Sequence, residues 1–206
     1  MKIAVVDYDM GNLHSVCKAL EYAGAETLIT HVPAELASAD AIVLPGVGSF
    51  DPAVKKIRDR DLEQPIKDII ASGKPFLGIC LGLQILFDRS DEGNEAGLGI
   101  IAGTVKKFQS EPNLTIPQMG WNQLALSQPN CLLWSELGSA EWVYFDHSYY
   151  VEPTQPAVSA AMVTHGSQTV TAAISLRNIV AVQFHPEKSS TIGLRMLSNF
   201  VQTVGD

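Results

Sequence analysis

The stretch KPFLGICLGLQ at residues 74–84 constrains the fold more than any other part of the chain. Its apolar run predicts a buried strand that ends in a tight turn, with Cys80 at the apex and a helix beginning at Leu81. The apex of such a turn has a strained backbone, and the residues two positions away on each side pass too close for a Cβ atom. Gly78 and Gly82 occupy those two positions. The segment therefore matches a nucleophile elbow, here with sulfur.

The elbow would make Cys80 reactive. A helix N-terminus offers free N–H groups and the positive end of the helix dipole, which favour a thiolate over a thiol. The N–H group of Leu81 could also hold an oxyanion. The alternative is a structural cysteine, because free cysteines commonly fill apolar cores. The motif alone does not decide between the two roles.

The composition is that of an ordered globular protein. Apolar residues are 46% and charged residues 17% of 206 residues, so we expect one domain over residues 1–206 with a core of its own. The net charge of −8 argues against nucleic acid or an anionic membrane as the main partner. The chain shows neither a membrane-spanning apolar run nor a signal-peptide pattern, which predicts a cytoplasmic protein. The three cysteines are far apart and lack a C-x-x-C spacing, so they suggest neither a disulfide framework nor a zinc site. We expect no cofactor and no metal.

The first half of the chain alternates strands and helices. Apolar runs at residues 3–6, 26–30 and 41–44 predict strands, and helical spacing after Asn12, a candidate cap, predicts a helix. Continuous apolar strands separated by helices indicate a parallel sheet that is covered on both faces. In such sheets ligands bind at the carboxyl ends of the strands.

One of these carboxyl ends carries the sequence PGVGS at residues 45–49. Two glycines around Val47 free the backbone to turn an N–H group outward, so Val47 could supply a second oxyanion donor if its strand lies beside Cys80. The alternative is an ordinary turn into a helix that is capped by Asp51 and Pro52.

The pattern changes beyond Phe87. The acidic residues 88–95 predict a loop, and residues 97–107 predict one or two strands. Further strands are expected at residues 121–126, 142–150, 157–163, 169–176 and 179–184. The second half should thus be β-rich and extend the sheet with antiparallel strands, which makes the fold class α/β.

The last predicted strand runs into QFHPE at residues 183–187. Residues two apart in an extended chain point to the same side, and Pro186 prevents a helical bend, so His185 and Glu187 can project together. A thiol needs a base, and the base needs a carboxylate to orient it. The alternative is a surface turn before the last helix. Among the other histidines, only His147 has comparable neighbours, in FDHSYY at residues 145–150.

Together these segments resemble the class I, or triad, glutamine amidotransferases. Residues 78–84 match the nucleophile motif of that family, and residues 185–187 match its His and Glu motif. One branch, the glutaminase subunit of imidazole glycerol phosphate synthase, also resembles DYDMGNL, PQMGWN, HSYY and QFHPEKS in this chain. The resemblance covers about residues 3–202 and implies a flavodoxin-like fold. Asp9 departs from the usual glycine of that branch and Gln118 from its common histidine, but neither lies on the triad.

The resemblance implies hydrolysis of glutamine to glutamate and ammonia through a thioester. Cys80 would attack the side-chain amide, His185 would move the protons, and Glu187 would hold His185. Backbone N–H groups of Leu81 and Val47 would hold the oxyanion. Substrate contacts are implied for Gly48, Gln84, Glu92, Ser148 and Tyr149. For Glu92 the alternative is a solvated residue of the acidic loop.

The resemblance also implies a protein partner. The family passes ammonia through a tunnel to a (β/α)8-barrel cyclase, which makes imidazole glycerol phosphate and AICAR in histidine biosynthesis. We expect interface contacts from Asn12, from Lys188 and from Trp121, which should lie in irregular chain before its strand. Alternatively, Trp121 is core and Lys188 is solvated. Two rival functions stay open: another triad glutaminase, such as that of pyridoxal phosphate synthesis, and a catalytically inactive flavodoxin-like binding subunit.

Overall fold

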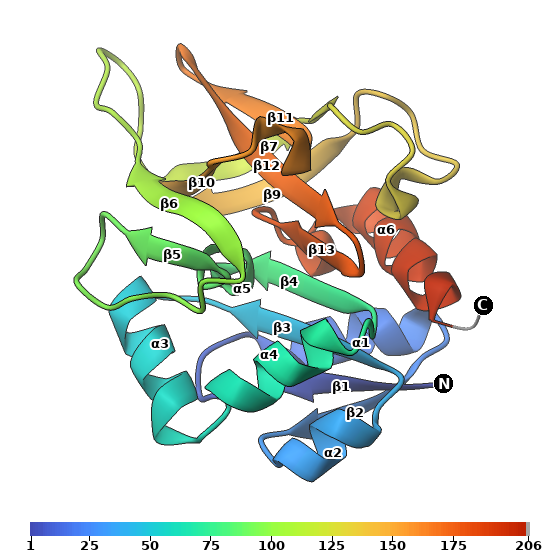
Figure 1. Ribbon diagram of the computed structural model, residues 1–206. Coiled ribbons are helices and arrows are strands. Elements are labelled where there is room, and N and C mark those ends of the chain that lie inside the picture. Colours follow the sequence, from blue (N-terminus) through green and yellow to red (C-terminus); the bar gives the residue numbers. More distant parts are fainter. Residues whose placement is uncertain (205–206) are drawn as a thin grey trace.

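The computed structural model describes residues 1–204 and consists of an eleven-stranded sheet flanked by helices, with a separate two-stranded sheet (Figure 1). Five strands form the parallel part of the large sheet, in the order β2-β1-β3-β4-β13. Their bounds are β1 (Lys2–Val6), β2 (Glu26–Thr30), β3 (Ala41–Gly46), β4 (Phe76–Cys80) and β13 (Ile179–Val182). Every residue of β3, β4 and β13 is buried, as continuous apolar runs predict for a sheet covered on both faces.

Two groups of helices cover the two faces of this sheet. α1 (Leu13–Tyr22) and α6 (Ser190–Thr203) contribute buried residues such as Val16 and Phe200 to one core. α2 (Pro33–Ser38), α3 (Phe50–Asp59) and α4 (Glu63–Ala71) contribute Leu36, Val54 and Ile66 to the other. The sheet between two cores confirms the predicted α/β class.

The second half of the chain extends the sheet beyond β13 mostly through antiparallel pairs. β12, β10 and β6 follow in this order, β5 pairs with β6 in parallel, and β11 joins β12 and β8. The bounds are β5 (Phe87–Ser90), β6 (Ile101–Lys107), β8 (Ala125–Leu126), β10 (Tyr149–Pro153), β11 (Ser159–His165) and β12 (Gln168–Leu176). β7 (Gln118–Gln123) and β9 (Trp142–His147) make the small antiparallel sheet. Short 3-10 turns lie at Leu132–Trp134, Pro156–Val158 and Pro186–Lys188.

The structure corrects three expectations about these strands. The loop predicted from residue 88 begins later, because β5 extends to Ser90 and the Asp88 carboxylate accepts the N–H group of Gly103 from β6. Trp121 lies within β7, not before it. The single strand expected over residues 142–150 is two strands that break at Ser148 and pair with different neighbours.

Two helix starts also differ from the expectation. Asn12 stands at the N-cap of α1, but its side chain makes no capping hydrogen bond. Ser49, not Asp51, is the N-cap residue of α3. The Asp51 carboxylate instead accepts the backbone N–H groups of Asn94 and Glu95, so it ties the acidic segment to α3. Along residues 1–204, no helix is both long and apolar enough to cross a membrane.

Candidate active site

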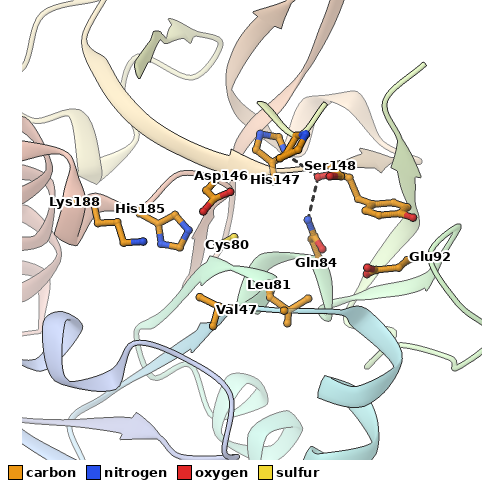
Figure 2. Close-up of a pocket in the computed structure, with 13 residues that line it drawn as sticks. Val47, Cys80, Leu81, Gln84, Glu92, Asp146, His147, Ser148, His185 and Lys188 are labelled. Atoms are coloured by element: carbon orange, nitrogen blue, oxygen red, sulfur yellow. Dashed lines mark hydrogen bonds between the residues drawn. The ribbon is translucent and has the colours of Figure 1, made fainter. Parts of the chain in front are cut away.

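The carboxyl ends of β3, β4 and β13 meet the junction of β9 and β10 around a pocket (Figure 2). The pocket brings together most of the residues singled out in the sequence. They are Val47, Gly48, Cys80, Leu81, Gln84, Glu92, Ser148, Tyr149, His185 and Lys188. Pro117, Asp146 and His147 also line it and were not among the predicted site residues. The site thus combines a parallel part of the sheet with an antiparallel part.

The predicted elbow is present at the end of β4. Cys80 has φ 54° and ends the strand, and α5 (Leu81–Gln84) begins at the next residue. A Cβ atom on Gly82 would lie 1.8 Å from the carbonyl oxygen of Leu44, and one on Gly78 would lie 2.9 Å from the carbonyl oxygen of Gly82. Close packing therefore leaves no room for a side chain at either glycine, and Cys80 between them has a positive φ that side chains rarely adopt.

The strand β3 brings Val47 beside the elbow. β3 pairs with β4 in parallel, with Gly46 opposite Cys80, so Val47 follows at the level of the sulfur. Gly48 has φ +102°, and a Cβ atom there would lie 2.8 Å from the Cε atom of Met10. Val47 itself is exposed and faces the pocket together with Leu81. Both positions suit backbone donors to an oxyanion, and that role stays a prediction.

His185 and Glu187 form a buried pair behind the sulfur. Nδ1 of His185 donates to Oε1 of Glu187 over 2.8 Å, and both side chains are almost fully buried. Burial lowers the pKa of His185, but hydrogen bonds with Cys80 and Glu187 outweigh it and raise this pKa to about 10. At neutral pH, His185 therefore carries a proton between a sulfur and a carboxylate.

His147 shows the opposite behaviour in the facing wall. Burial lowers its pKa to about 4, so the ring is neutral at pH 7. Its Nδ1 atom lies 2.7 Å from the carbonyl oxygen of Tyr149, which can only accept, so the single proton rests on Nδ1. Nε2 is then an acceptor and faces the amide of Gln118. The amide nitrogen of Gln118 is buried and has no partner among residues 1–204. Rotating this amide by 180° would point its nitrogen at Nε2 of His147.

Two residues implied as substrate contacts have further bonds. Gln84 is buried, and its Nε2 donates to the carbonyl oxygen of Tyr149 and to Oε1 of Gln183, each over 3.0 Å. Glu92 accepts the N–H group of Phe50 over 2.8 Å at the first turn of α3, and it faces the pocket. The alternative for Glu92, a solvated loop residue, does not hold, since its carboxylate fixes a helix start.

Trp121 and Lys188 converge on one tyrosine. The Trp121 ring packs edge-on against Tyr144 with centroids 6.2 Å apart, and the Lys188 ammonium lies 5.7 Å from the centre of the same ring. Trp121 is 50% exposed, so the alternative of a core residue is wrong. Asn12 is exposed but does not line the pocket.

The geometry can be set against known proteins. The family model described as Glutamine amidotransferase class-I matches residues 4–204. The imidazole glycerol phosphate synthase subunit HisH of Trichodesmium erythraeum is 69% identical over 98% of this chain and 94% of its own length. The subunit of the same name in Trichormus variabilis is 68% identical over 98% of this chain and 96% of its own length. The chain belongs to the class I glutamine amidotransferase family, in the group of HisH subunits.

Two solved structures share the fold of this amidotransferase at low sequence identity. A crystal structure of a glutamine amidotransferase superimposes with a TM-score of 0.74 at 18% identity, over 98% of this chain and 99% of that one. The glutaminase domain of Trypanosoma brucei CTPS with bound acivicin superimposes with a TM-score of 0.71 at 20% identity, over 100% of this chain and 94% of that one. At these identities the likeness concerns the fold alone.

One buried residue of the amidotransferase site was missed in the sequence. Gln183 is fully buried, and its Nε2 donates to the Cys80 sulfur over 3.6 Å. The alternation of an extended chain places Gln183 on the same side as His185, so this signal was available. In residues 1–204, no three His, Cys, Asp or Glu side chains are grouped to hold a metal ion.

Proposed function

We propose that this amidotransferase is the glutaminase subunit of imidazole glycerol phosphate synthase and hydrolyses glutamine to glutamate and ammonia. The observation that carries the proposal is that Cys80 and His185 line the same pocket, while Glu187 is bonded to His185 over 2.8 Å. These residues supply a nucleophile, a proton carrier and an orienting carboxylate, which are the three roles of a triad. The similarity to HisH subunits over nearly the whole chain supports the choice of branch.

The proposed reaction has two halves. The Cys80 sulfur attacks the side-chain amide carbon of glutamine, and the N–H groups of Leu81 and Val47 hold the oxyanion. The carbon–nitrogen bond breaks as His185 gives its proton to the departing nitrogen, which leaves ammonia and a thioester. His185 then takes a proton from water, the hydroxide attacks the thioester, and glutamate departs as the sulfur is freed. Glu187 stabilises the imidazolium throughout.

The other pocket residues are proposed to hold the two charged ends of the substrate. Glu92 supplies a negative charge for the ammonium group, at the side of the pocket that lies away from His185 (Figure 2). Gln84, Ser148 and Tyr149 line the wall between these two points, where the chain of glutamine would lie. Gly48 lines the pocket next to Val47 and is proposed as a further substrate contact.

The proposed partner is a (β/α)8-barrel cyclase that receives the ammonia. Two aromatic rings and one ammonium group, from Trp121, Tyr144 and Lys188, gather in one place, and Lys188 also lines the pocket. An exposed aromatic residue beside a cation is typical of an interface centre. A cyclase seated there would cover the mouth through which ammonia leaves. Asn12 as a further contact, a single domain over residues 1–206 and a cytoplasmic location stay predictions.

Two rival functions are weaker. Another triad glutaminase, such as that of pyridoxal phosphate synthesis, fits the pocket equally well, but the similarity at 65–69% identity is to HisH subunits. An inactive binding module would have no need of a buried His185–Glu187 pair, because such a pair costs desolvation.

The Cys80→Ala variant tests the proposal. We expect it to release no glutamate from glutamine, whereas the assembled variant with the cyclase still forms imidazole glycerol phosphate from added ammonium. Glutamate release measured by a coupled dehydrogenase assay gives the first result, and product formation with ammonium gives the second. Retained glutamate release would remove Cys80 from the mechanism. Activity with a different ammonia acceptor, and none with the cyclase, would favour the first rival.

A further inference from the structure

Gln183 links the two ends of the site through its side-chain amide. Its Nε2 atom lies 3.6 Å from the Cys80 sulfur, and its Oε1 atom accepts the Nε2–H group of Gln84 over 3.0 Å. The side chain is fully buried, and its own backbone N–H group donates to Ala172 over 2.8 Å. Gln183 does not line the pocket, so it reaches the chemistry only through Cys80 and Gln84.

The orientation of the Gln183 side-chain amide is fixed by the hydrogen bonds of its neighbour Gln84. The carbonyl oxygen of Tyr149 can only accept, and it receives the Nε2–H group of Gln84 over 3.0 Å. The nitrogen of Gln84 therefore points toward the start of β10, as the dashed line in Figure 2 shows. The same nitrogen faces Gln183, which must present its oxygen there. The N–H groups of Gln183 are consequently turned to the sulfur.

A donor at this place matters because the sulfur is buried. Cys80 is 7% exposed, and a buried anion is costly unless hydrogen bonds compensate for the lost water. Gln183 provides one donor to the sulfur, and His185, whose pKa Cys80 helps to raise, lines the same pocket. Hydrogen bonds to an ionised group are stronger than bonds between neutral groups, and such a bond also fixes the direction of the sulfur.

We propose that Gln183 is a positioning residue, which holds the Cys80 sulfur as a thiolate in its attacking direction and connects it to Gln84 on the substrate side. The second half of this statement rests on the proposed function, whereas the first half concerns the sulfur alone. The titratable and charged groups around Cys80 are buried Tyr8 and the pocket residues Glu92, Asp146, His147, Tyr149, His185 and Lys188. Gln183→Met changes none of them, whereas Gln183→Glu adds one carboxylate.

The test compares Gln183→Met and Gln183→Glu with the wild type. Alkylation of the Cys80 peptide by iodoacetamide is followed by mass spectrometry as a function of pH, which needs no glutamine. Gln183→Met removes the N–H donor, and we expect the midpoint of alkylation to rise by about one pH unit. Gln183→Glu keeps an acceptor for Gln84 but brings a carboxylate to the sulfur, so the midpoint should rise further.

Gln128 offers a matched control. Its Nε2 atom donates to the carbonyl oxygens of Ala157 and Ser175, remote from the pocket. Gln128→Met and Gln128→Glu change a half-buried amide that also donates hydrogen bonds, and the alkylation midpoint should stay at the wild-type value. Circular dichroism checks that each variant is folded.

An unchanged midpoint in folded Gln183 variants would overturn the proposal, and so would an equal rise in the Gln128 controls. If neither Gln183 variant folds, Gln84→Leu replaces them, because it frees the Gln183 amide to turn away, and the same rise is expected. Absence of that rise would also overturn the proposal. Glutamate release is measured in parallel with the wild type. A midpoint shift in a protein that never hydrolyses glutamine would reject the proposed function and leave the role of Gln183 at the sulfur intact.

Discussion

Two buried histidines face the pocket from different regions, and they hold their protons differently. His185 follows β13 in the parallel part of the large sheet, and His147 ends β9 in the small antiparallel sheet. Their exposed fractions are similar, 3% and 6%. Burial lowers the pKa of both rings. The pKa of His185 is nevertheless raised to about 10, because Cys80 and Glu187 are its partners. The pKa of His147 falls to about 4, because its partners are a neutral carbonyl group and a neutral amide. Charged partners, not burial, separate the two rings.

This contrast assigns different tasks to the two walls of the pocket. The wall at β4 and β13 carries groups that can exchange protons, namely Cys80 and His185. The wall at the junction of β9 and β10 carries a neutral ring that holds the carbonyl group of Tyr149, which in turn orients Gln84. We therefore expect changes in the first wall to affect turnover and its pH dependence, and changes in the second to affect the shape and the stability of the site.

The largest effect should come from the elbow in the first wall. Gly82→Ala places a Cβ atom 1.8 Å from the Leu44 carbonyl oxygen, so either the elbow or β3 must move. We expect the free energy of unfolding to fall by about 3 kcal/mol or more, or folding to fail. Gly24→Ala is the control, because Gly24 also has a positive φ, +95°, but no atom lies within 4 Å of its added Cβ. Urea unfolding of both variants measures the difference, and equal losses would contradict the close packing.

The next effect concerns the carboxylate behind His185. Glu187→Gln preserves a hydrogen-bonding partner for Nδ1 but removes the charge that stabilises the imidazolium. We expect turnover of glutamine to fall about a thousandfold, by analogy with the loss of charge in other triads. Glu111→Gln serves as the control, since Glu111 is a carboxylate bonded to Ser167 outside the pocket. Steady-state glutamate release is the measurement, and a Glu187 variant with wild-type turnover would make this residue merely structural.

The effect in the second wall is absent at neutral pH and appears only in acid. The pKa of His147 is lowered from 6.5 to about 4 in the folded protein, so the unfolded chain binds its proton first as the pH falls. The stabilisation that comes from keeping His147 neutral is complete above pH 6.5. It is lost as the pH falls from about 6.5 to about 4, which lowers the free energy of unfolding by up to about 3 kcal/mol. His147→Gln should flatten this part of the stability curve. His185 acts in the opposite sense, because stability from its raised pKa is lost as the pH rises from 6.5 toward 10.

Chemical unfolding at a series of pH values tests this prediction. The wild-type minus variant difference isolates His147 from the carboxylates that also titrate in acid. A difference that stays constant between pH 4 and pH 7 would show that His147 does not remain neutral in the folded protein.

The first wall could be predicted because its signals are local. Gly78, Cys80 and Gly82 stand within one short segment, and His185 and Glu187 within another, so the turn and the strand alternation place each group. Ligands bind at the carboxyl ends of parallel strands, and β3 lies beside β4, so this rule was enough to place Val47 near Cys80.

The second wall could not be predicted in the same way. Gln118, His147 and Gln84 come from β7, β9 and α5, and they meet only through antiparallel pairing and a break at Ser148. No local pattern states which strands pair over such separations. β5 was missed for a similar reason, since the carboxylate of Asp88, its one acidic residue, accepts a backbone N–H group of β6. Gln183 was within reach of the alternation argument, and the family resemblance named Gln84, but no pattern predicted the bond between them.

The most direct test of the account is an NMR titration of the imidazole rings in one sample of the wild-type protein. His185 should remain protonated above pH 8, because Cys80 and Glu187 hold its proton, and its titration should move to lower pH in Cys80→Ala. His147 should remain neutral until the pH falls below about 5. Titration of both rings near the ordinary value of 6.5 would contradict the claim that the two walls hold their histidines in opposite states of charge.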